Sequence, residues 1–151
     1  MSIELRPATP TDYPAILGLI KELAEFEHAS EKVTNTVEQM NKEDDLFEAI
    51  VALDGDTIAG MALYFFAYYT WVGKSLYLDD LYIQPEYRSR GIGSRLMNEV
   101  FKVGKEQNCK RIRWQVLNWN QDAVNLYKKI GATIDDGWCN CDIENFTGGQ
   151  E

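Results

Sequence analysis

The sequence predicts a single α/β domain in which a mixed central β-sheet is flanked by helices. The first observation behind this fold class is the order of elements: a strand and two helices, a meander of three strands, then helix, strand, helix and strand. The second is that 151 residues, 45% of them hydrophobic, suffice for one core without metal or disulfide support. We expect the domain to span residues 1–146 and residues 147–151 to form a flexible tail.

The N-terminal part of the chain predicts one strand and two helices. Residues 3–6 form the candidate strand. Thr9 then suits a helix N-cap, Pro10 the first helical position and Asp12 the first turn. Apolar residues recur at helical spacing after this start and predict a buried face, made of Tyr13, Ile16, Leu17, Ile20, Leu23 and Ala24. A second, polar helix is predicted over residues 36–41.

Three β-rich runs follow in the middle of the chain. Residues 47–53 and 57–68 are separated by Asp54-Gly55-Asp56, and an Asp-Gly pair between two such runs is typical of a β-hairpin. The third run covers residues 75–83 and ends before Pro85. Consecutive β-rich runs of this kind predict a meander.

The C-terminal part predicts helices alternating with strands. Residues 91–105 carry apolar residues on one helical face, and residues 111–116 form the next strand candidate. Asn120 opens a further helix, which Gly131 ends at the position after its C-cap. Residues 139–143 are the candidate for a last strand.

The charge balance disfavours some classes of partner. Fifteen basic and 24 acidic residues give a net charge of −9, which repels nucleic acid and anionic membranes but is compatible with cationic substrates. No apolar run approaches the roughly 20 residues that span a bilayer, and residues 1–5 lack a secretory signal. We therefore expect a soluble cytoplasmic protein that binds neither nucleic acid nor membrane.

Cysteine and histidine usage argues against two kinds of site. Cys109, Cys139 and Cys141 are an odd number and do not form the ligand pairs that zinc requires. His28 is the only histidine, so a Ser-His or Cys-His nucleophilic site would depend on that one residue. We expect neither a metal nor a hydrolase site.

The stretch from Pro85 to Ser94, PEYRSRGIGS, is the first candidate site. It lies between a predicted strand and a predicted helix, where glycines allow a close approach of a ligand and the first helical N–H groups are unpaired. Such a turn binds phosphate, and flanking arginines strengthen the binding. The spacing alone is equally compatible with a helix cap that carries surface arginines, because the stretch matches neither a Walker A loop nor a GxGxxG turn.

Arg88-x-x-Gly91-x-Gly93, after the strand Leu81-Tyr82-Ile83, resembles the acyl-CoA pyrophosphate loop of the GNAT N-acetyltransferases. Along most of its length the chain is similar to the spermidine/spermine (diamine/thialysine) N-acetyltransferase-like branch of that superfamily. The matching segments occur in the order of the family pattern: Arg6–Thr9, Ile20–Ala24, Trp71–Lys74, Leu76–Asp80, Tyr87–Arg88, Gly91–Ser94, Trp119–Asn120 and Asn125–Ala132. The element order also matches the GNAT fold.

The resemblance implies acetyl-CoA as co-substrate. It places the pantetheine arm along one strand, the pyrophosphate at the loop and helix start, and a further cofactor contact at a later helix start. The implied cofactor-binding residues are Leu81, Tyr82, Ile83, Arg88, Ser89, Arg90, Gly91, Ile92, Gly93, Ser94, Asn120, Gln121, Asp122 and Ala123.

Tyr127 is the candidate general acid. Its spacing alone favours a core tyrosine, since it shares an apolar helical face with Val124 and Ile130. The resemblance implies instead that it protonates the departing CoA thiolate, and a phenol of pKa about 10 keeps its proton at neutral pH.

Asp79 and Asp80 lie in a predicted strand, where aspartate is unusual. Strand alternation predicts opposite faces, with Asp80 on the side of Leu78 and Tyr82, so the two carboxyls are not expected to share a proton. One interpretation is a strand-end or bulge carboxylate bonded to nearby backbone. The resemblance implies that Asp79 binds the ammonium substrate and helps to remove its proton.

Further residues match the substrate side of the family pattern, although each alone also fits a solvated charge or a packed aromatic. The implied substrate-binding set is Phe26, Glu27, Trp71, Asp79, Arg113, Trp114, Gln115, Asp136 and Trp138. The chain departs from the pattern at Tyr69-Thr70-Trp71, which lacks an acid two residues before the tryptophan. A diamine or a lysine-like amino acid is therefore as compatible as a longer polyamine.

We thus expect a cytoplasmic GNAT-type N-acetyltransferase that acetylates a primary amine on a small cationic molecule by direct attack in a ternary complex. The resemblance implies a homodimer, with the C-terminal strand as a candidate interface. Two alternatives remain: a GNAT enzyme acting on a protein or peptide N-terminus or lysine, and a non-enzymatic acyl-CoA-binding sensor.

Overall fold

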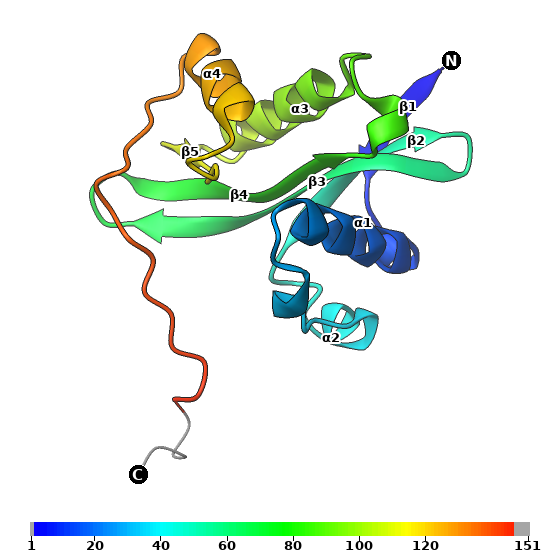
Figure 1. Ribbon diagram of the computed structural model, residues 1–151, viewed down its shortest axis with the longest axis horizontal. Coiled ribbons are helices and arrows are strands. Elements are labelled where there is room, and N and C mark those ends of the chain that lie inside the picture. The colour runs from blue at the N-terminus through cyan, green and yellow to red at the C-terminus, as the bar shows by residue number, and fades with distance from the viewer. Residues whose placement is uncertain (1, 147–151) are drawn as a thin grey trace. The chain divides into compact units, whose positions relative to one another are not determined.

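The computed structural model describes residues 2–146. The chain divides into two units, Met1–Gln115 and Val116–Glu151, and each is described here by itself. The first unit contains a five-stranded sheet with helices on both faces (Figure 1). The expected tail over residues 147–151 lies outside the described residues.

The sheet has the strand order β1-β2-β3-β4-β5. Its first four strands are antiparallel neighbours, and β5 is parallel to β4. This arrangement confirms the predicted mixed sheet. The strands are β1 (Ile3–Pro7), β2 (Glu48–Asp54), β3 (Thr57–Tyr69), β4 (Gly73–Ile83) and β5 (Ile112–Arg113).

Helices of the first unit cover both faces of this sheet. The α-helices α1 (Tyr13–Phe26) and α2 (Val37–Lys42) lie on one face, and α3 (Ile92–Glu106) lies on the other (Figure 1). The second unit contains α4 (Gln121–Lys129). Short 3₁₀ turns occur at η1 (Pro10–Asp12), η2 (Ser30–Lys32) and η3 (Pro85–Tyr87).

The start of the first helical segment is fixed by Asp12. The Thr9 backbone N–H donates to the Asp12 carboxylate at 2.8 Å, and Arg6 donates two further hydrogen bonds to it at 2.7 and 3.0 Å. The bidentate arginine lowers the pKa of Asp12 below its usual value. These bonds tie β1 to the start of α1, and Thr9 is the N-cap of the 3₁₀ turn η1 that leads into this helix.

Each face of the sheet packs against its own helices. The α1 side holds a continuous core that includes Tyr13, Ile16, Leu17, Met40, Val51, Met61, Leu63 and Tyr82. On the other face α3 buries Ile92, Leu96, Met97 and Val100. Helix α3 also approaches β5 closely, because a Cβ added at Gly104 would lie 2.9 Å from Ile112 Cδ1. The Ile112 side chain therefore points toward α3.

A β-bulge interrupts the β3–β4 pair. Leu63 lies opposite Asp80 and Tyr64 lies opposite Leu78, so Asp79 is the additional residue on β4. Directly opposed residues share a face, and Leu63 belongs to the core beneath α1. Asp80 therefore faces α1 together with Tyr82, whereas Leu78 faces α3. The prediction that Asp80 shares a face with both of these neighbours was wrong for Leu78, because alternation reverses at a bulge.

The second unit is partly helical. The Asn120 side chain accepts from the Ala123 N–H at 3.4 Å, and Gly131 follows α4 with a φ of 96°, so both predicted helix ends are confirmed. The strand predicted over residues 139–143 is absent, because no strand of the described chain pairs with that segment. Strand β5 is shorter than the predicted run over 111–116, because only Ile112 and Arg113 pair with β4.

Candidate active site

Three carboxylates form an acidic cluster in the first unit: Glu27, Asp79 and Asp80. Glu27 is the C-cap residue of α1, Asp79 is the bulge residue of β4, and Asp80 points toward the α1 side. Burial raises the pKa of Asp80 to about 7, with further contributions from the negative charges of Asp79 and Glu27. The bulge and the end of α1 thus bring together two residues that sequence reasoning selected and one, Asp80, that it did not.

The two aspartates interact electrostatically, and the expectation that they do not share a proton stays a prediction. The charge of Asp79 raises the pKa of both Asp80 and Glu27. The pKa of Asp79 itself is raised by loss of hydration around its carboxyl, although the residue keeps an exposed surface. The predicted bulge is confirmed at Asp79, whereas the bond from its carboxylate to nearby backbone stays a prediction. A carboxyl with a pKa of about 7 exchanges protons readily at neutral pH, which suits acid–base chemistry.

Aromatic side chains continue this face of the sheet beyond Asp80. The rings of Phe65 and Tyr77 are stacked with their centroids 5.2 Å apart. Burial raises the pKa of Tyr77, and the charge of Asp79 raises it further. The acidic cluster therefore lies next to an aromatic surface, and this combination favours the binding of an organic cation.

The outer edge of β4 is paired along only part of its length. In the part of the chain that the structure describes, β5 pairs with β4 at Leu76–Ile112 and Tyr77–Arg113, and no strand pairs with that edge from Leu78 to Ile83. The backbone of Leu81, Tyr82 and Ile83 lies in this segment. A strand edge of this kind can hydrogen-bond an extended amide-containing ligand.

The Arg88–Ser94 loop joins this edge to α3. The Arg88 Nε donates to the Ile83 carbonyl at 2.9 Å, and the Arg88 guanidinium lies over the Tyr82 ring. Ser89 and Gly91 adopt positive φ angles of 65° and 78°, and Gly91 is the N-cap of α3. This local conformation turns the chain from the strand edge into the first turn of the helix.

The first turn of α3 presents backbone donors and open space. The first N–H groups of a helix have no partner within the helix, so they attract anions. A Cβ added at Gly91 or Gly93 would meet no atom within 4 Å, so both glycines leave room for a ligand. Arg90 lies over the Tyr87 ring, and the Tyr87 hydroxyl donates to Asp54 at 2.8 Å. These features fit a pyrophosphate and provide it with both backbone donors and arginines.

The second unit carries the other cofactor-side candidates on α4. Asn120 caps the helix, Gln121 donates to Asn125 at 2.9 Å, and Asp122 is exposed in the first turn. Tyr127 is half-buried, and burial raises its pKa above the usual value. Tyr127 therefore keeps its proton at neutral pH, as a general acid requires.

The remaining substrate-side candidates are mostly exposed. Phe26 at the end of α1 is 47% exposed and Trp71 in the β3–β4 connection is 84% exposed. Trp114 and Gln115 directly follow β5. In the second unit Trp138 donates through Nε1 to Asp135 at 2.9 Å. Asp135 and the predicted Asp136 are both exposed.

Sequence reasoning missed residues that share a face with the predicted ones. The resemblance assigns the substrate role to Asp79 alone, and regular alternation predicts that Asp80 lies on the opposite face. Phe65, Tyr69 and Tyr77 were not selected either, although strand spacing places Phe65 and Tyr69 on one face. Arg111 lies two residues before the predicted Arg113, so strand spacing places these two arginines on one face as well.

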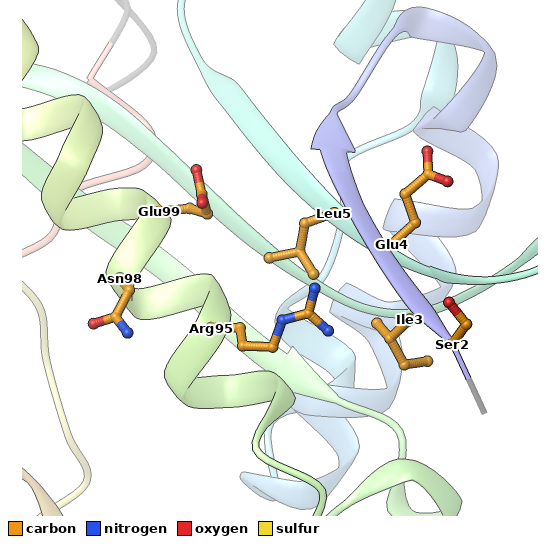
Figure 2. A pocket seen from close by; sticks show the side chains of 7 residues that line it. All are labelled: Ser2, Ile3, Glu4, Leu5, Arg95, Asn98 and Glu99. Carbon is orange, nitrogen blue, oxygen red and sulfur yellow. The ribbon is translucent and has the colours of Figure 1, made fainter.

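A separate groove lies at the opposite edge of the sheet. It has a volume of about 570 Å³ and is lined by residues of β1 and α3, with Arg95 extending from the helix toward the strand (Figure 2). The groove does not include the acidic cluster, whose residues belong to β4 and the end of α1. Within residues 2–146, no set of His, Cys, Asp or Glu side chains suits a metal ion, and no helix has the length and hydropathy of a membrane span.

Residues 13–132 match the model of a family described as the acetyltransferase (GNAT) family. The chain is 38% identical to the thialysine N-epsilon-acetyltransferase of Sus scrofa, over 91% of this chain and 89% of that protein. It is 31% identical to the human spermidine/spermine N(1)-acetyltransferase-like protein 1, over 89% of this chain and 21% of that protein. A structure of an acetyltransferase from Clostridium acetobutylicum with acetyl-CoA superposes with a TM-score of 0.79 at 19% identity, covering 93% of this chain and 96% of the other, and supports the fold.

Proposed function

This chain belongs to the GNAT acetyltransferase family, and we propose that it transfers an acetyl group from acetyl-CoA to a primary amine of a small cationic molecule. It is an acetyltransferase, and the acceptor class is a polyamine, a diamine or a lysine-like amino acid. The observation that carries this acceptor class is the acidic cluster of Glu27, Asp79 and Asp80 beside the stacked rings of Phe65 and Tyr77. Negative charge next to an aromatic floor favours an organic ammonium ion.

The donor site proposed for acetyl-CoA combines the free edge of β4 with the Arg88–Ser94 loop. Backbone groups of Leu81, Tyr82 and Ile83 would hydrogen-bond the amides of the pantetheine arm. The start of α3, with its unpaired N–H groups and the open space at Gly91 and Gly93, would bind the pyrophosphate. Residues Asn120–Ala123 at the start of α4 would complete the contacts with the donor.

In the proposed reaction the free amine attacks the thioester carbonyl carbon directly. A C–N bond forms, the C–S bond breaks, and the electron pair of that bond leaves with the CoA sulfur. The substrate ammonium must first lose a proton, and Asp79 and Asp80 are the groups proposed to bind it and accept that proton. Their raised pKa values bring them closer to the range in which a carboxylate acts as a base at neutral pH.

Tyr127 is the proposed proton donor to the departing thiolate. Burial raises its pKa, so the hydroxyl is protonated before the C–S bond breaks. The proton then moves to sulfur and yields free CoA, and the proton that the attacking nitrogen releases as the amide forms restores the tyrosine hydroxyl. Phenylalanine at this position would preserve the ring and remove the proton.

The relatives support an amine with a second charged group nearby. Two of them are named for thialysine and for spermidine or spermine, which are small amines that carry more than one nitrogen. The missing acid at Tyr69 in this chain reduces the negative charge available for a long polycation. A diamine or a lysine-like amino acid is therefore as compatible with this site as a longer polyamine.

A homodimer in the cytoplasm is also part of the proposal, without a role for nucleic acid or membranes. Trp138, Ile143 and Phe146 are exposed in the second unit, and large apolar side chains gathered in one segment favour a contact with another chain. The net charge of −9 disfavours nucleic acid and anionic lipid. Sedimentation velocity tests the dimer, and a monomer at micromolar concentration would contradict it.

An acceptor panel tests the proposed function. Spermidine, putrescine, thialysine, lysine and a short basic peptide are each incubated with the protein and acetyl-CoA, and free CoA thiol is measured. We expect the highest kcat/KM for one of the small amines. A preference for the peptide would favour the protein-acetylating alternative. Thermal stabilisation by acetyl-CoA without turnover of any acceptor would favour the sensor.

A further inference from the structure

Two arginines lie on the same face of the sheet as the acidic cluster, further along the strands. The Arg113 guanidinium carbon lies 4.5 Å from the centroid of the Tyr69 ring, and that of Arg111 lies 5.6 Å from it. Arg113 is opposite Tyr77 in the β4–β5 pair, and Tyr77 is opposite Phe65 in the β3–β4 pair. Since Phe65 and the core residue Leu63 alternate to the same face, these side chains all face the α1 side.

The two guanidinium groups have no carboxylate partner in this region. Within residues 2–146, neither Arg111 nor Arg113 takes part in an ion pair; the ion pairs formed elsewhere include Arg6–Asp12, Lys42–Glu38 and Lys102–Glu99. A guanidinium stacked on a ring keeps its in-plane N–H groups available, and these fit a carboxylate in a bidentate manner. In a chain with a net charge of −9, two unpaired arginines on one aromatic ring therefore suit an anionic group of a ligand.

The face thus has a negative end, an aromatic middle and a positive end. Tyr77 lies between the two ends, because the charges of Asp79 and Arg113 both act on its hydroxyl, in opposite directions. Along β4, Asp79 lies two residues after Tyr77, which corresponds to about 7 Å. In the other direction Gly73, the residue opposite Tyr69, lies four residues before Tyr77, which corresponds to about 13 Å. The Arg113 guanidinium lies toward Tyr69, so its separation from the aspartates is on the order of 10 to 20 Å.

A lysine-like amino acid matches this separation. Its extended chain places the side-chain nitrogen about 8 Å from the carboxylate. With a hydrogen bond of about 3 Å at each end, the bound molecule would span about 14 Å. A diamine of the same length lacks the anionic group, and so leaves the positive end of the face without a partner.

We propose that Arg113, held by Tyr69 and assisted by Arg111, binds the carboxylate of an amino-acid acceptor whose side-chain amine lies at Asp79 and Asp80. This inference rests on the proposed function, because it assigns the acceptor of the same site. Arg113 then selects a zwitterionic acceptor over a diamine and directs acetylation to the side-chain nitrogen.

The test compares acceptors that differ only in the carboxylate: L-lysine with 1,5-diaminopentane, and L-ornithine with 1,4-diaminobutane. In the wild-type protein we expect a higher kcat/KM for each amino acid than for its diamine, and a product acetylated on the side-chain nitrogen by NMR. Arg113→Gln should lower kcat/KM for the amino acids at least 10-fold, mainly through KM, and change that for the diamines less than 2-fold.

Three controls separate this role from a structural one. Lys74→Gln removes a charge from the same hairpin on the α3 side, where Lys74 lies over Phe66, and should leave the preference unchanged. Arg113→Lys keeps the charge but loses the bidentate geometry, and should give an intermediate KM. Thermal unfolding and the KM for acetyl-CoA should be the same for Arg113→Gln and the wild type.

Several outcomes would overturn the inference while the proposed function stands. The first is that Arg113→Gln lowers kcat/KM equally for amino acids and diamines. The second is that the wild-type enzyme has a higher kcat/KM for diamines than for amino acids. The third is that the α-amine of the amino acid is acetylated. A wild-type protein that acetylates none of the four compounds and no other small amine would instead contradict the proposed function itself.

Discussion

Asp80 lies opposite Leu63 across the β3–β4 pair, on the face of the sheet that α1 covers. This relationship exists because Asp79 is bulged out of the ladder one residue earlier. The bulge turns a carboxylate into the α1 side, where burial and two negative neighbours raise its pKa to about 7. Regular alternation would place Asp80 on the face opposite to Asp79. Because of the bulge, Asp80 is instead part of the candidate active site.

Replacing Tyr127 by phenylalanine should remove the proposed general acid. We expect Tyr127→Phe to lower kcat about 100-fold or more, since the loss of a positioned proton donor typically costs that much. The KM for acetyl-CoA should change little, because the ring stays in place. The measurement is steady-state release of CoA thiol. Tyr68→Phe, at a largely exposed tyrosine, is the matched control, and equal rates for both variants would remove Tyr127 from the mechanism.

Asp79→Asn should impair acceptor binding and proton removal. We expect kcat/KM for the amine to fall about 100-fold. The loss of the neighbouring charge should also lower the pKa of Asp80, because that charge is one cause of its elevation. The acidic limb of the profile of kcat/KM against pH should therefore move to lower pH. Asp56→Asn in the β2–β3 turn is the control. An unchanged profile and rate in Asp79→Asn would argue against its assigned role.

Asp80→Asn should change the pH dependence of stability. The pKa of Asp80 is raised from 3.8 to about 7, so the folded chain holds this proton more tightly than the unfolded chain. This carboxyl therefore makes the free energy of unfolding decrease as the pH rises from about 4 to about 7. The melting temperature of the variant relative to wild type should be higher at pH 8 than at pH 4.5, by about 4 °C or more. Circular dichroism melts at both pH values measure it, and a difference independent of pH would contradict the raised pKa.

Gly93→Ala should separate cofactor binding from folding. A Cβ at Gly93 meets no protein atom within 4 Å, and alanine favours the helix, so the ligand-free protein should be as stable as wild type or more stable. The same methyl group would occupy space proposed for the pyrophosphate, so acetyl-CoA should bind at least 10-fold more weakly by calorimetry. Gly18→Ala is the control, because Gly18 is another helical glycine with open space around it. This variant should keep or raise the stability of the protein without weakening the binding of acetyl-CoA. Unchanged acetyl-CoA affinity in Gly93→Ala would place the pyrophosphate elsewhere.

Local signals accounted for most of the fold. The N-cap at Asn120, the Asp-Gly hairpin after Asp54, and the α3 periodicity each depend on neighbouring residues, and the structure confirms them. The strand predicted over residues 139–143 is absent for a different reason. A strand forms only where a partner strand pairs with it, and that partner often lies far away in the sequence or in another chain. A β-rich composition alone therefore does not produce a strand.

The sequence by itself determined the fold class, the loop before α3 and the family, because these are written in short patterns of glycine, arginine and apolar spacing. Only the tertiary structure decided which side chains share a face. The bulge at Asp79, the turn of Asp80 toward α1, and the placement of Arg113 on Tyr69 all depend on the register between strands. Register results from packing across the whole sheet, and a shift of one residue moves every following side chain to the other face.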